Sequence, residues 1–403
     1  MGRASRRIYK EDLKSPKPLY TVWELTLRCD QACRHCGSRA GPARTDELST
    51  AEALEVAAQL VTLGTREVTM IGGEAYLRPD LELLIAFLVD NGVRVTMQTG
   101  GRAVDLDMCK RLKDAGLSGI GVSIDGLKES HETLRGIKGG YDLCLRALDA
   151  SRTAGLITTS NIQINRLNMG ELAQLADVLQ DHGVSVWQVQ LTVPMGRAAD
   201  HPDWIVQPWM MLEIVESLAE IQREAVRRVE GTNRRPFDIY AGNNIGYFGP
   251  HEVVLRSRPG KGAEHWNGCR AGQQVMGIEA DGLIKACPSL PTAPYDGGNI
   301  RDTSLDEIWH HNDNMRFARD RDTSELWGFC KGCYYAETCR AGCSFTAHCT
   351  LGKRGNQPFC YYRASQLQRK GVRERLVHAV APEGKPFDFG RFELVEEPWP
   401  APE

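Results

Sequence analysis

Cysteines are the residues of this 403-residue chain most suited to metal chemistry, and there are thirteen of them. Three lie in one loop, Cys29-Asp-Gln-Ala-Cys33-Arg-His-Cys36, and eight lie between residues 269 and 360. A reducing compartment keeps thiols out of disulfides, so an odd and clustered set indicates metal or cluster ligation rather than a disulfide framework. The sequence therefore predicts two separate metal regions.

The first region offers three thiolates with the spacing C-x3-C-x2-C. A closed 4Fe-4S cluster takes four protein ligands, so three cysteines leave one iron open to a small molecule. Spacing alone also permits a zinc site that lacks one ligand, or a chance grouping.

The second region follows the pattern C-x12-G-x4-C, then C-x2-C-x5-C-x3-C, then one last cysteine. Cys349 falls in the same region but outside the pattern. A pair of zinc knuckles is the alternative for this region. Cys109 and Cys144 stand alone in amphipathic stretches, where a buried structural cysteine is expected. The members of the pattern are Cys269, Cys287, Cys330, Cys333, Cys339, Cys343 and Cys360.

Short apolar, β-branched runs alternate with amphipathic stretches from residue 20 to residue 193, which is typical of strand–helix units around a parallel sheet. With right-handed crossovers, six such units form an α/β fold, a partial (β/α)6 barrel whose functional loops follow the strands. We expect strands at 20–27, 67–71, 94–99, 119–124, 158–164 and 185–193, and helices at 50–63, 81–90, 106–115, 141–154, 171–182 and 205–230.

The cysteine-rich region is predicted to be a small second domain with helices and a β-hairpin, whose strands at 275–279 and 283–286 meet at Asp281-Gly282. The last 25 residues, rich in Pro and Glu, read as a tail. The predicted divisions are an N-terminal extension 1–19, a barrel 20–235, a bridge 236–265, a cysteine-rich domain 266–375 and a tail 376–403.

Charge and hydropathy indicate which kinds of partner are not expected. The formal net charge is -3 and basic residues form no long run, so a nucleic acid partner is not expected. No stretch reaches the roughly 18 apolar residues of a membrane span. We expect a cytoplasmic protein that neither crosses nor enters a membrane.

The first cysteine loop resembles the radical S-adenosylmethionine (SAM) superfamily, in which this spacing after the first strand binds a 4Fe-4S cluster that chelates SAM. The resemblance implies that Cys29, Cys33 and Cys36 hold that cluster. Gly72-Gly73-Glu74 resembles the family's Gly-Gly-Glu motif, which receives the methionyl amino group. The residue types suit this role, because glycines permit a close backbone approach and a carboxylate pairs with an ammonium.

Four further positions bear on the resemblance. Ala75 departs from it, because the family usually has proline there. Ser123 lies in a segment similar to the family's ribose-contacting segment, and Arg135 resembles an arginine near the SAM carboxylate. His35 takes the place of an aromatic ring that packs near the adenine.

The second cysteine pattern resembles the SPASM domain, which binds two auxiliary 4Fe-4S clusters. The resemblance implies three clusters in total. Cys269, Cys287 and Cys343 would hold one auxiliary cluster with one ligand missing, which leaves an open iron unless Cys349 or another side chain fills the place. The complete auxiliary cluster would be held by Cys330, Cys333, Cys339 and Cys360.

The resemblance implies an enzyme that cleaves SAM reductively and abstracts hydrogen from its substrate. Most SPASM enzymes act on peptides, so oxidative modification of a ribosomally made peptide, such as a crosslink or an epimerisation, is the first hypothesis. Modification of a small molecule or a tetrapyrrole is the alternative, and a non-catalytic iron–sulfur or zinc protein is an alternative of another class.

Partners follow from the same resemblance. A flavodoxin or ferredoxin would supply electrons. About 20 residues precede the barrel, too few for a peptide-recognition domain, so leader binding would need a separate recognition protein or a different surface. Between the barrel and the cysteine-rich domain, Tyr240, Asn243, Asn244 and Tyr247 are candidate substrate contacts.

Overall fold

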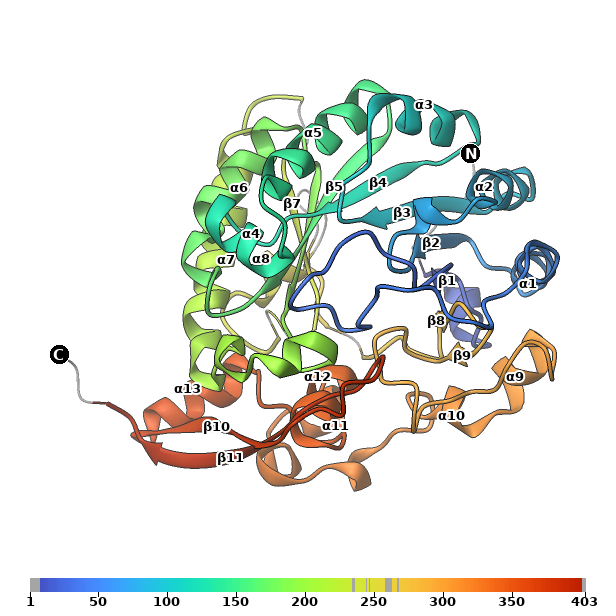
Figure 1. Ribbon diagram of the computed structural model, residues 1–403. Coiled ribbons are helices and arrows are strands. Elements are labelled where there is room, and N and C mark those ends of the chain that lie inside the picture. Colours follow the sequence, from blue (N-terminus) through green and yellow to red (C-terminus); the bar gives the residue numbers. More distant parts are fainter. Residues whose placement is uncertain are drawn as a thin grey trace.

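Short strands alternate with amphipathic helices from Tyr20 to Leu191, as the sequence pattern predicts (Figure 1). The computed structural model describes residues 8–233, 236–243, 245, 247–257, 263–266 and 268–400, and Asn244 lies outside them. The strands of the main sheet are β1 Tyr20–Glu24, β2 Glu67–Ile71, β3 Arg94–Thr99, β4 Gly119–Ser123, β5 Ile157–Ile164, β6 Val186–Leu191, β7 Asp238–Ala241, β8 Val275–Ile278 and β9 Ile284–Lys285.

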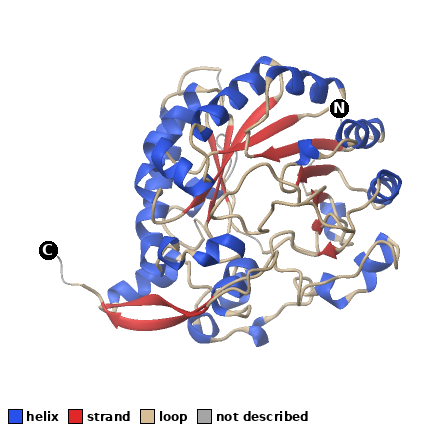
Figure 2. Ribbon diagram, in the orientation of Figure 1, coloured by secondary structure: helices blue, strands red, loops and turns tan. Residues whose placement is uncertain are grey.

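These strands form one sheet in the order β7-β6-β5-β4-β3-β2-β1-β8-β9, parallel except for the antiparallel β8–β9 pair. Helices cover the outer face of the curved sheet (Figure 2). The predicted α/β partial barrel is confirmed, and so is the hairpin at Asp281-Gly282, where Gly282 takes a φ of 88°.

Two strand pairings correct the expectation of six strands and a separate hairpin. Residues 238–241 of the predicted bridge form β7, which extends the sheet beyond β6. On the other edge, β8 of the hairpin pairs with β1, with Tyr20 opposite Val275 and Trp23 opposite Ile278. A four-residue strand is too short to show a periodic pattern, and the partner of an edge strand is set by tertiary packing.

The helices around the barrel begin and end near the predicted residues, with three differences. Helix α8, only five residues long, lies in the predicted bridge, where no helix is expected. Helix α4, which ends at Arg135, is not predicted, because only a narrow stripe of its side chains is buried. Helix α7 begins at Met211 rather than at 205, since Pro202 and Pro208 start short 3-10 turns ahead of it. These helices are α1 Thr50–Thr62, α2 Leu81–Asp90, α3 Leu106–Asp114, α4 Lys128–Arg135, α5 Gly140–Thr153, α6 Leu172–Asp181, α7 Met211–Arg227 and α8 Glu252–Arg256.

The C-terminal part carries five short helices and a second sheet. They are α9 Leu305–His311, α10 Asp313–Arg316, α11 Ala336–Cys339, α12 Ser344–Leu351 and α13 Tyr361–Arg369, followed by the strands β10 Val372–Val380 and β11 Arg391–Pro398.

The expected tail is therefore a β-hairpin, drawn in red in Figure 1. Leu376 and Phe392 bury their side chains, and the Gln207 side chain hydrogen-bonds both the N–H and the C=O of Leu376, at 2.7 and 3.4 Å. Side chains alternate between the two faces of each strand, so one face packs against the protein, and this alternation is not evident from the Pro and Glu content.

Buried charges join the barrel to the hairpin β8–β9. Arg44 Nη2 lies 3.2 Å from Glu24 Oε1 and 3.1 Å from Glu279 Oε2. Glu279 also pairs with Lys285 at 2.6 Å. Burial raises the pKa of Glu24 to about 7, with Arg44 opposing and Glu279 adding to the rise.

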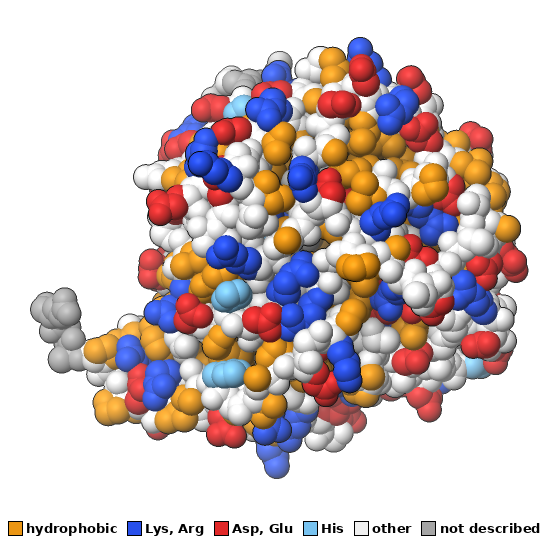
Figure 3. Space-filling view, viewed as in Figure 1, with side chains coloured by type: hydrophobic (Ala, Val, Ile, Leu, Met, Phe, Trp, Pro, Cys, Tyr) orange, Lys and Arg blue, Asp and Glu red, His pale blue; other side chains and the backbone are white. Residues whose placement is uncertain are grey.

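The surface mixes both signs of charge over the face shown in Figure 3. No helix in the described part of the chain has the length and apolar character needed to span a bilayer.

Candidate functional site

The first cysteine loop directly follows β1, and donors from the protein face each of its sulfurs. The N–H of Gln31 donates to Cys29 Sγ at 3.4 Å, Arg135 Nη1 lies 3.6 Å from Cys33 Sγ, and Cys36 Sγ lies 3.5 Å from the Ser38 hydroxyl. Burial raises the pKa of Cys29 to about 12, a preference that a bound cation reverses.

The Gly72-Gly73 pair packs directly on the segment between β1 and the cysteine loop. A Cβ on Gly72 would lie 2.2 Å from the carbonyl oxygen of Thr26, and one on Gly73 would lie 2.2 Å from that of Arg28. The backbone N–H groups of Gly73 and Glu74 donate to those same two oxygens, each at 2.8 Å. Glycine is therefore required for this backbone contact, which places Glu74 beside Cys29.

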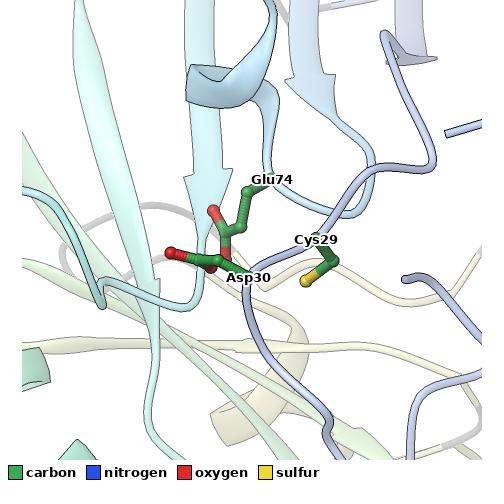
Figure 4. A group of neighbouring side chains, drawn as sticks. All are labelled: Cys29, Asp30 and Glu74. Carbon is green, nitrogen blue, oxygen red and sulfur yellow. The ribbon is translucent and has the colours of Figure 1, made fainter. Parts of the chain in front are cut away.

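Glu74 points its buried carboxylate toward Cys29 and Asp30, and the ligand atoms of the three side chains lie within 4.8 Å of one another (Figure 4). The carboxylate accepts hydrogen bonds from Gln31 Nε2 at 2.8 Å, Thr99 Oγ1 at 2.5 Å and the Gly100 N–H at 2.7 Å. A carboxylate has about four acceptor positions, so one remains for an ammonium group.

The loop after β2, which carries Glu74, has two further features. Burial raises the pKa of Glu74 to about 7, opposed by the hydrogen bonds from Thr99 and Gly100. Ala75, the departure from the family motif, is fully buried and begins a 3-10 turn that ends at Leu77, so the loop is ordered without proline.

Asp125, after β4, connects two predicted site residues that belong to different segments. Its Oδ2 lies 3.0 Å from His35 Nε2 and 2.6 Å from Arg135 Nη2. His35 Nδ1 lies 3.0 Å from the carbonyl oxygen of Leu134. Asp125 belongs to the segment after β4 that resembles the family's ribose-contacting segment, but its contacts with His35 and Arg135 are not predicted from the sequence.

Ser123 ends β4 and opens a row of neighbouring residues across the sheet. Its partner on β5 is Asn161, which lies next to Gln188 on β6, which in turn lies next to Tyr240 on β7. Asn161, Gln188 and Tyr240 line a cavity of about 1060 Å³ inside the barrel. The cavity also takes in Gln98, whose Oε1 accepts a hydrogen bond from Asn161 at 2.6 Å.

Ser123 and Tyr240 are predicted from the sequence, whereas Asn161 and Gln188, the polar residues between them, are not. The available signal is the alternation of polar residues along β5 and β6, which points one face of each strand into the barrel.

The structure brings Cys330, Cys333, Cys339 and Cys360 together. Burial raises the pKa of Cys360 to about 11, and the neighbouring Cys330 and Cys333 add to the rise. Burial likewise raises the pKa of Cys339, with Cys360, Cys330 and Cys333 as further causes. These four thiols, which the resemblance to the SPASM domain implies as one ligand set, lie within electrostatic reach of one another.

A second set contains Cys269, Cys287 and Cys343. Burial raises the pKa of Cys287 to about 12, and Cys269 and Cys343 add to it. Cys349 is fully buried on α12, and its pKa is raised by burial and then by Cys343 and Cys287. Cys349 therefore belongs to the surroundings of this set.

The space beside these cysteines suits an anionic group. A cavity of about 280 Å³ is lined by Cys269 of one set, Cys339 of the other and Arg321. Arg321 is buried, and its Nε and Nη2 atoms have no hydrogen-bond partner among the described residues. A buried cation with unpaired donors fits thiolate-ligated iron–sulfur clusters, which carry net negative charge.

The candidate substrate residues of the bridge do not form one site. Asn243 accepts a hydrogen bond from the Leu191 N–H at 2.8 Å and lies 3.9 Å from Cys343 Sγ through Nδ2. Tyr247 is buried against Arg256, whose guanidinium lies 4.0 Å from the ring centre. Of the three candidates that lie among the described residues, only Tyr240 lines the barrel cavity.

Comparison with known families matches residues 23–179 to the radical SAM superfamily and residues 269–334 to the SPASM iron–sulfur cluster-binding domain. The chain is a radical SAM enzyme with a SPASM domain. These matches imply SAM and iron–sulfur clusters as cofactors, and the cysteine sets described above have donors suited to them.

The enzyme is similar both to heme synthases and to mycofactocin maturases. It is 28% identical to an AdoMet-dependent heme synthase of Methanosarcina barkeri, over 86% of this chain and 97% of the relative. It is 26% identical to the mycofactocin maturase MftC of Mycolicibacterium smegmatis, over 89% of this chain and 87% of the relative.

Solved structures share the fold of the enzyme. Streptococcus suis SuiB bound to the precursor peptide SuiA superimposes with a TM-score of 0.62 at 15% identity, over 86% of this chain and 75% of SuiB. Native anSMEcpe with bound AdoMet and the Kp18Cys peptide gives a TM-score of 0.67 at 16% identity, over 86% of this chain and 94% of that one.

Proposed function

We propose that Cys29, Cys33 and Cys36 hold a 4Fe-4S cluster whose fourth iron binds SAM, and that Glu74 receives the methionyl ammonium group. The observation that carries this proposal is the position of the buried Glu74 carboxylate, within 4.8 Å of Cys29 Sγ. Reductive cleavage of SAM, followed by hydrogen abstraction from the substrate by the 5′-deoxyadenosyl radical, is the chemistry that the cluster supplies when bound.

The chain's own residues position the reactants. Gly72 and Gly73 fix Glu74 against the cysteine loop, and the three hydrogen bonds to its carboxylate hold it in one orientation. Ser123 lies at the carboxyl end of β4, where functional groups of such barrels gather, and is proposed to contact the ribose. His35 and Arg135 are proposed to border the adenine and the carboxylate of SAM.

The two further cysteine sets are proposed to hold two auxiliary 4Fe-4S clusters, three clusters in all. Their role would be to accept the electron that an oxidised substrate leaves behind. The set Cys269, Cys287 and Cys343 lacks one ligand in the sequence pattern, and the buried Cys349, which is within electrostatic reach of Cys343 and Cys287, is the proposed candidate to supply it.

The substrate is proposed to be a ribosomally made peptide that undergoes oxidative modification. Two of the three arginines that line the barrel cavity pair with acids: Arg94 with Glu67 at 3.0 Å and Arg228 with Asp177 at 2.7 Å. The third, Arg256, donates to the carbonyl oxygens of Ala241 and Ile245, at 2.8 and 2.5 Å. In contrast, no hydrogen bond among the described residues engages the side-chain amide of Gln188, which lines the same cavity. Neutral amides of this kind suit peptide groups, whereas the carboxylates of a tetrapyrrole call for unpaired cations.

Different relatives support each of the two substrate classes. MftC is called a maturase and SuiB is seen with a precursor peptide, which favours a peptide. The heme synthase of M. barkeri matches over 97% of its length, which favours a tetrapyrrole as the second candidate. A flavodoxin or ferredoxin as reductant, a separate peptide-recognition protein and a cytoplasmic location complete the proposal.

Isotope transfer tests the substrate class. The reconstituted enzyme is incubated with SAM, dithionite and either a deuterated peptide encoded beside its gene or a deuterated iron coproporphyrin. Deuterium should appear in 5′-deoxyadenosine only with the peptide, and Gln188→Leu should raise the KM for the peptide. Transfer from the porphyrin alone would replace the peptide proposal with the tetrapyrrole.

A further inference from the structure

The Asp125 carboxylate accepts hydrogen bonds from three directions in a fully buried position. Its Oδ2 accepts from Arg135 Nε at 2.8 Å and Nη2 at 2.6 Å, and lies 3.0 Å from His35 Nε2. Its Oδ1 accepts from the backbone N–H of Gln163 on β5 at 2.9 Å. Burial alone would raise the pKa of Asp125, but Arg135 and His35 hold it below its usual range.

Arg135 thereby reaches the first cysteine loop. A guanidinium is planar, so fixing Nε and Nη2 on Asp125 also fixes the direction of Nη1. That third nitrogen lies 3.6 Å from Cys33 Sγ. The backbone supports the contact, because the Arg34 N–H donates to the carbonyl oxygen of Leu134 at 2.8 Å, which joins the cysteine loop to the end of α4.

We propose that Asp125 is a positioning residue: it aims the Arg135 guanidinium at the sulfur of Cys33 and so raises the reduction potential of the cluster that Cys33 holds. The inference rests on the proposed function in one respect, namely that Cys33 is a cluster ligand. Hydrogen bonds and positive charge at cluster sulfurs stabilise the reduced, more negative state, which makes the cluster easier to reduce.

The proposed effect of Asp125 on the reduction potential has the opposite sign to the effect of its negative charge alone. Asp125 is itself negative, so its charge alone lowers the potential of a nearby cluster, and removal of that charge would raise it. If Asp125 acts by aiming Arg135, its removal costs the contact with Cys33 and the potential falls instead. The direction of the shift therefore separates the two explanations.

Asp125→Asn is the informative substitution because it cannot satisfy both sides of the site. The Gln163 N–H requires an acceptor at the Oδ1 position, which places the amide NH2 of the new side chain at the Oδ2 position. There it would face the Arg135 N–H groups, donor against donor. The guanidinium is then released from its fixed orientation.

The test is a potentiometric titration of the reconstituted full-length enzyme, in which the EPR signal that changes on addition of SAM identifies the first cluster. Arg135→Gln and Asp125→Asn should both shift its midpoint potential to more negative values. Addition of Asp125→Asn to Arg135→Gln should cause no further negative shift, since loss of Asp125 lowers the potential only through Arg135. A positive shift or an unchanged potential in Asp125→Asn would overturn the proposal.

Two further variants keep the result interpretable. Arg135→Lys tests the proposal if Asp125→Asn binds no iron: a single ammonium cannot contact Asp125 and Cys33 in the same way, so its potential should also fall. Asp142→Asn removes an exposed acid that pairs with Lys128 at 2.6 Å and should leave the potential unchanged. An unmodified enzyme without any SAM-responsive signal would instead refute the proposed function.

Discussion

Arg39, three residues beyond the first cysteine loop, pairs with Asp388 in the C-terminal hairpin, with Nε 2.7 Å from Oδ1. The same guanidinium makes two hydrogen bonds to Asp200, at 2.8 and 2.7 Å. Next to Asp388, the Phe387 ring lies below Arg44 and Lys285, at 5.3 and 4.7 Å from the two cationic groups. The tip of the hairpin is therefore fastened to the loop that carries the first three cysteines.

Asp388→Ala should weaken iron retention at the first cysteine loop. The Asp388 side chain is 7% exposed, so its loss leaves a partly buried guanidinium with fewer acceptors, at a cost of about 1–2 kcal/mol. The measurement is the rate at which a chelator removes iron, which should rise about 5- to 30-fold. Glu383→Gln, which alters an exposed pair with Lys385, is the control and should show no change.

Gly73→Ala should prevent the first loop from adopting its conformation, because the new Cβ would lie 2.2 Å from the carbonyl oxygen of Arg28. We expect loss of iron from the first site and loss of SAM binding, measured by iron content and by calorimetric titration with SAM. Gly41→Ala is the matched control in the same loop, since nothing lies within 4 Å of its Cβ position. Normal SAM affinity in the Gly73 variant would contradict the proposed role of the close approach.

Cys349→Ser should remove one auxiliary cluster. The sequence pattern favours an open iron beside Cys343, but the structure buries Cys349 near that residue and Cys287, which favours Cys349 as the fourth ligand. The variant should lose about four irons and one EPR signal. Cys109→Ser, at an equally buried thiol on α3, should keep them. An unchanged iron content in Cys349→Ser would support the open iron instead.

Glu24→Gln should make stability less sensitive to a rise in pH from about 4.5 to about 7. Burial raises the pKa of Glu24 to about 7 in the folded protein, from an ordinary value of 4.5. The folded state thus binds the proton more tightly, and stability is lost as the pH rises from about 4.5 to about 7, by about 3 kcal/mol in total. Above pH 7 the loss is complete.

The Tm difference between Glu24→Gln and the unmodified enzyme should therefore grow in favour of the variant from pH 5 to about pH 7.5 and then level off. Glu55→Gln, at an exposed position on α1, should give a constant difference. A constant difference in the Glu24 variant as well would show that the buried charges near Arg44 do not perturb its titration.

The sequence predicts the barrel well because each strand–helix unit carries its own periodic pattern and turn residues. It does not predict β7 or the β1–β8 pairing, since these depend on which edges meet after folding. The two cysteine regions follow from the sequence and the ligand sets within them from the family resemblance, whereas the partners of Glu74 and Arg135 follow from neither. Thr99 and Asp125 become recognisable only when the loops after different strands lie side by side.

The most direct test of the account replaces Cys29, Cys33 and Cys36 together with alanine and measures 5′-deoxyadenosine formed from SAM under dithionite. We expect that the triple variant forms no 5′-deoxyadenosine and still binds about eight irons of the roughly twelve in three clusters. The retained irons would show that the second cysteine region folds and holds its clusters without the first. Formation of 5′-deoxyadenosine by the triple variant would contradict the assignment of this loop as the site of SAM cleavage.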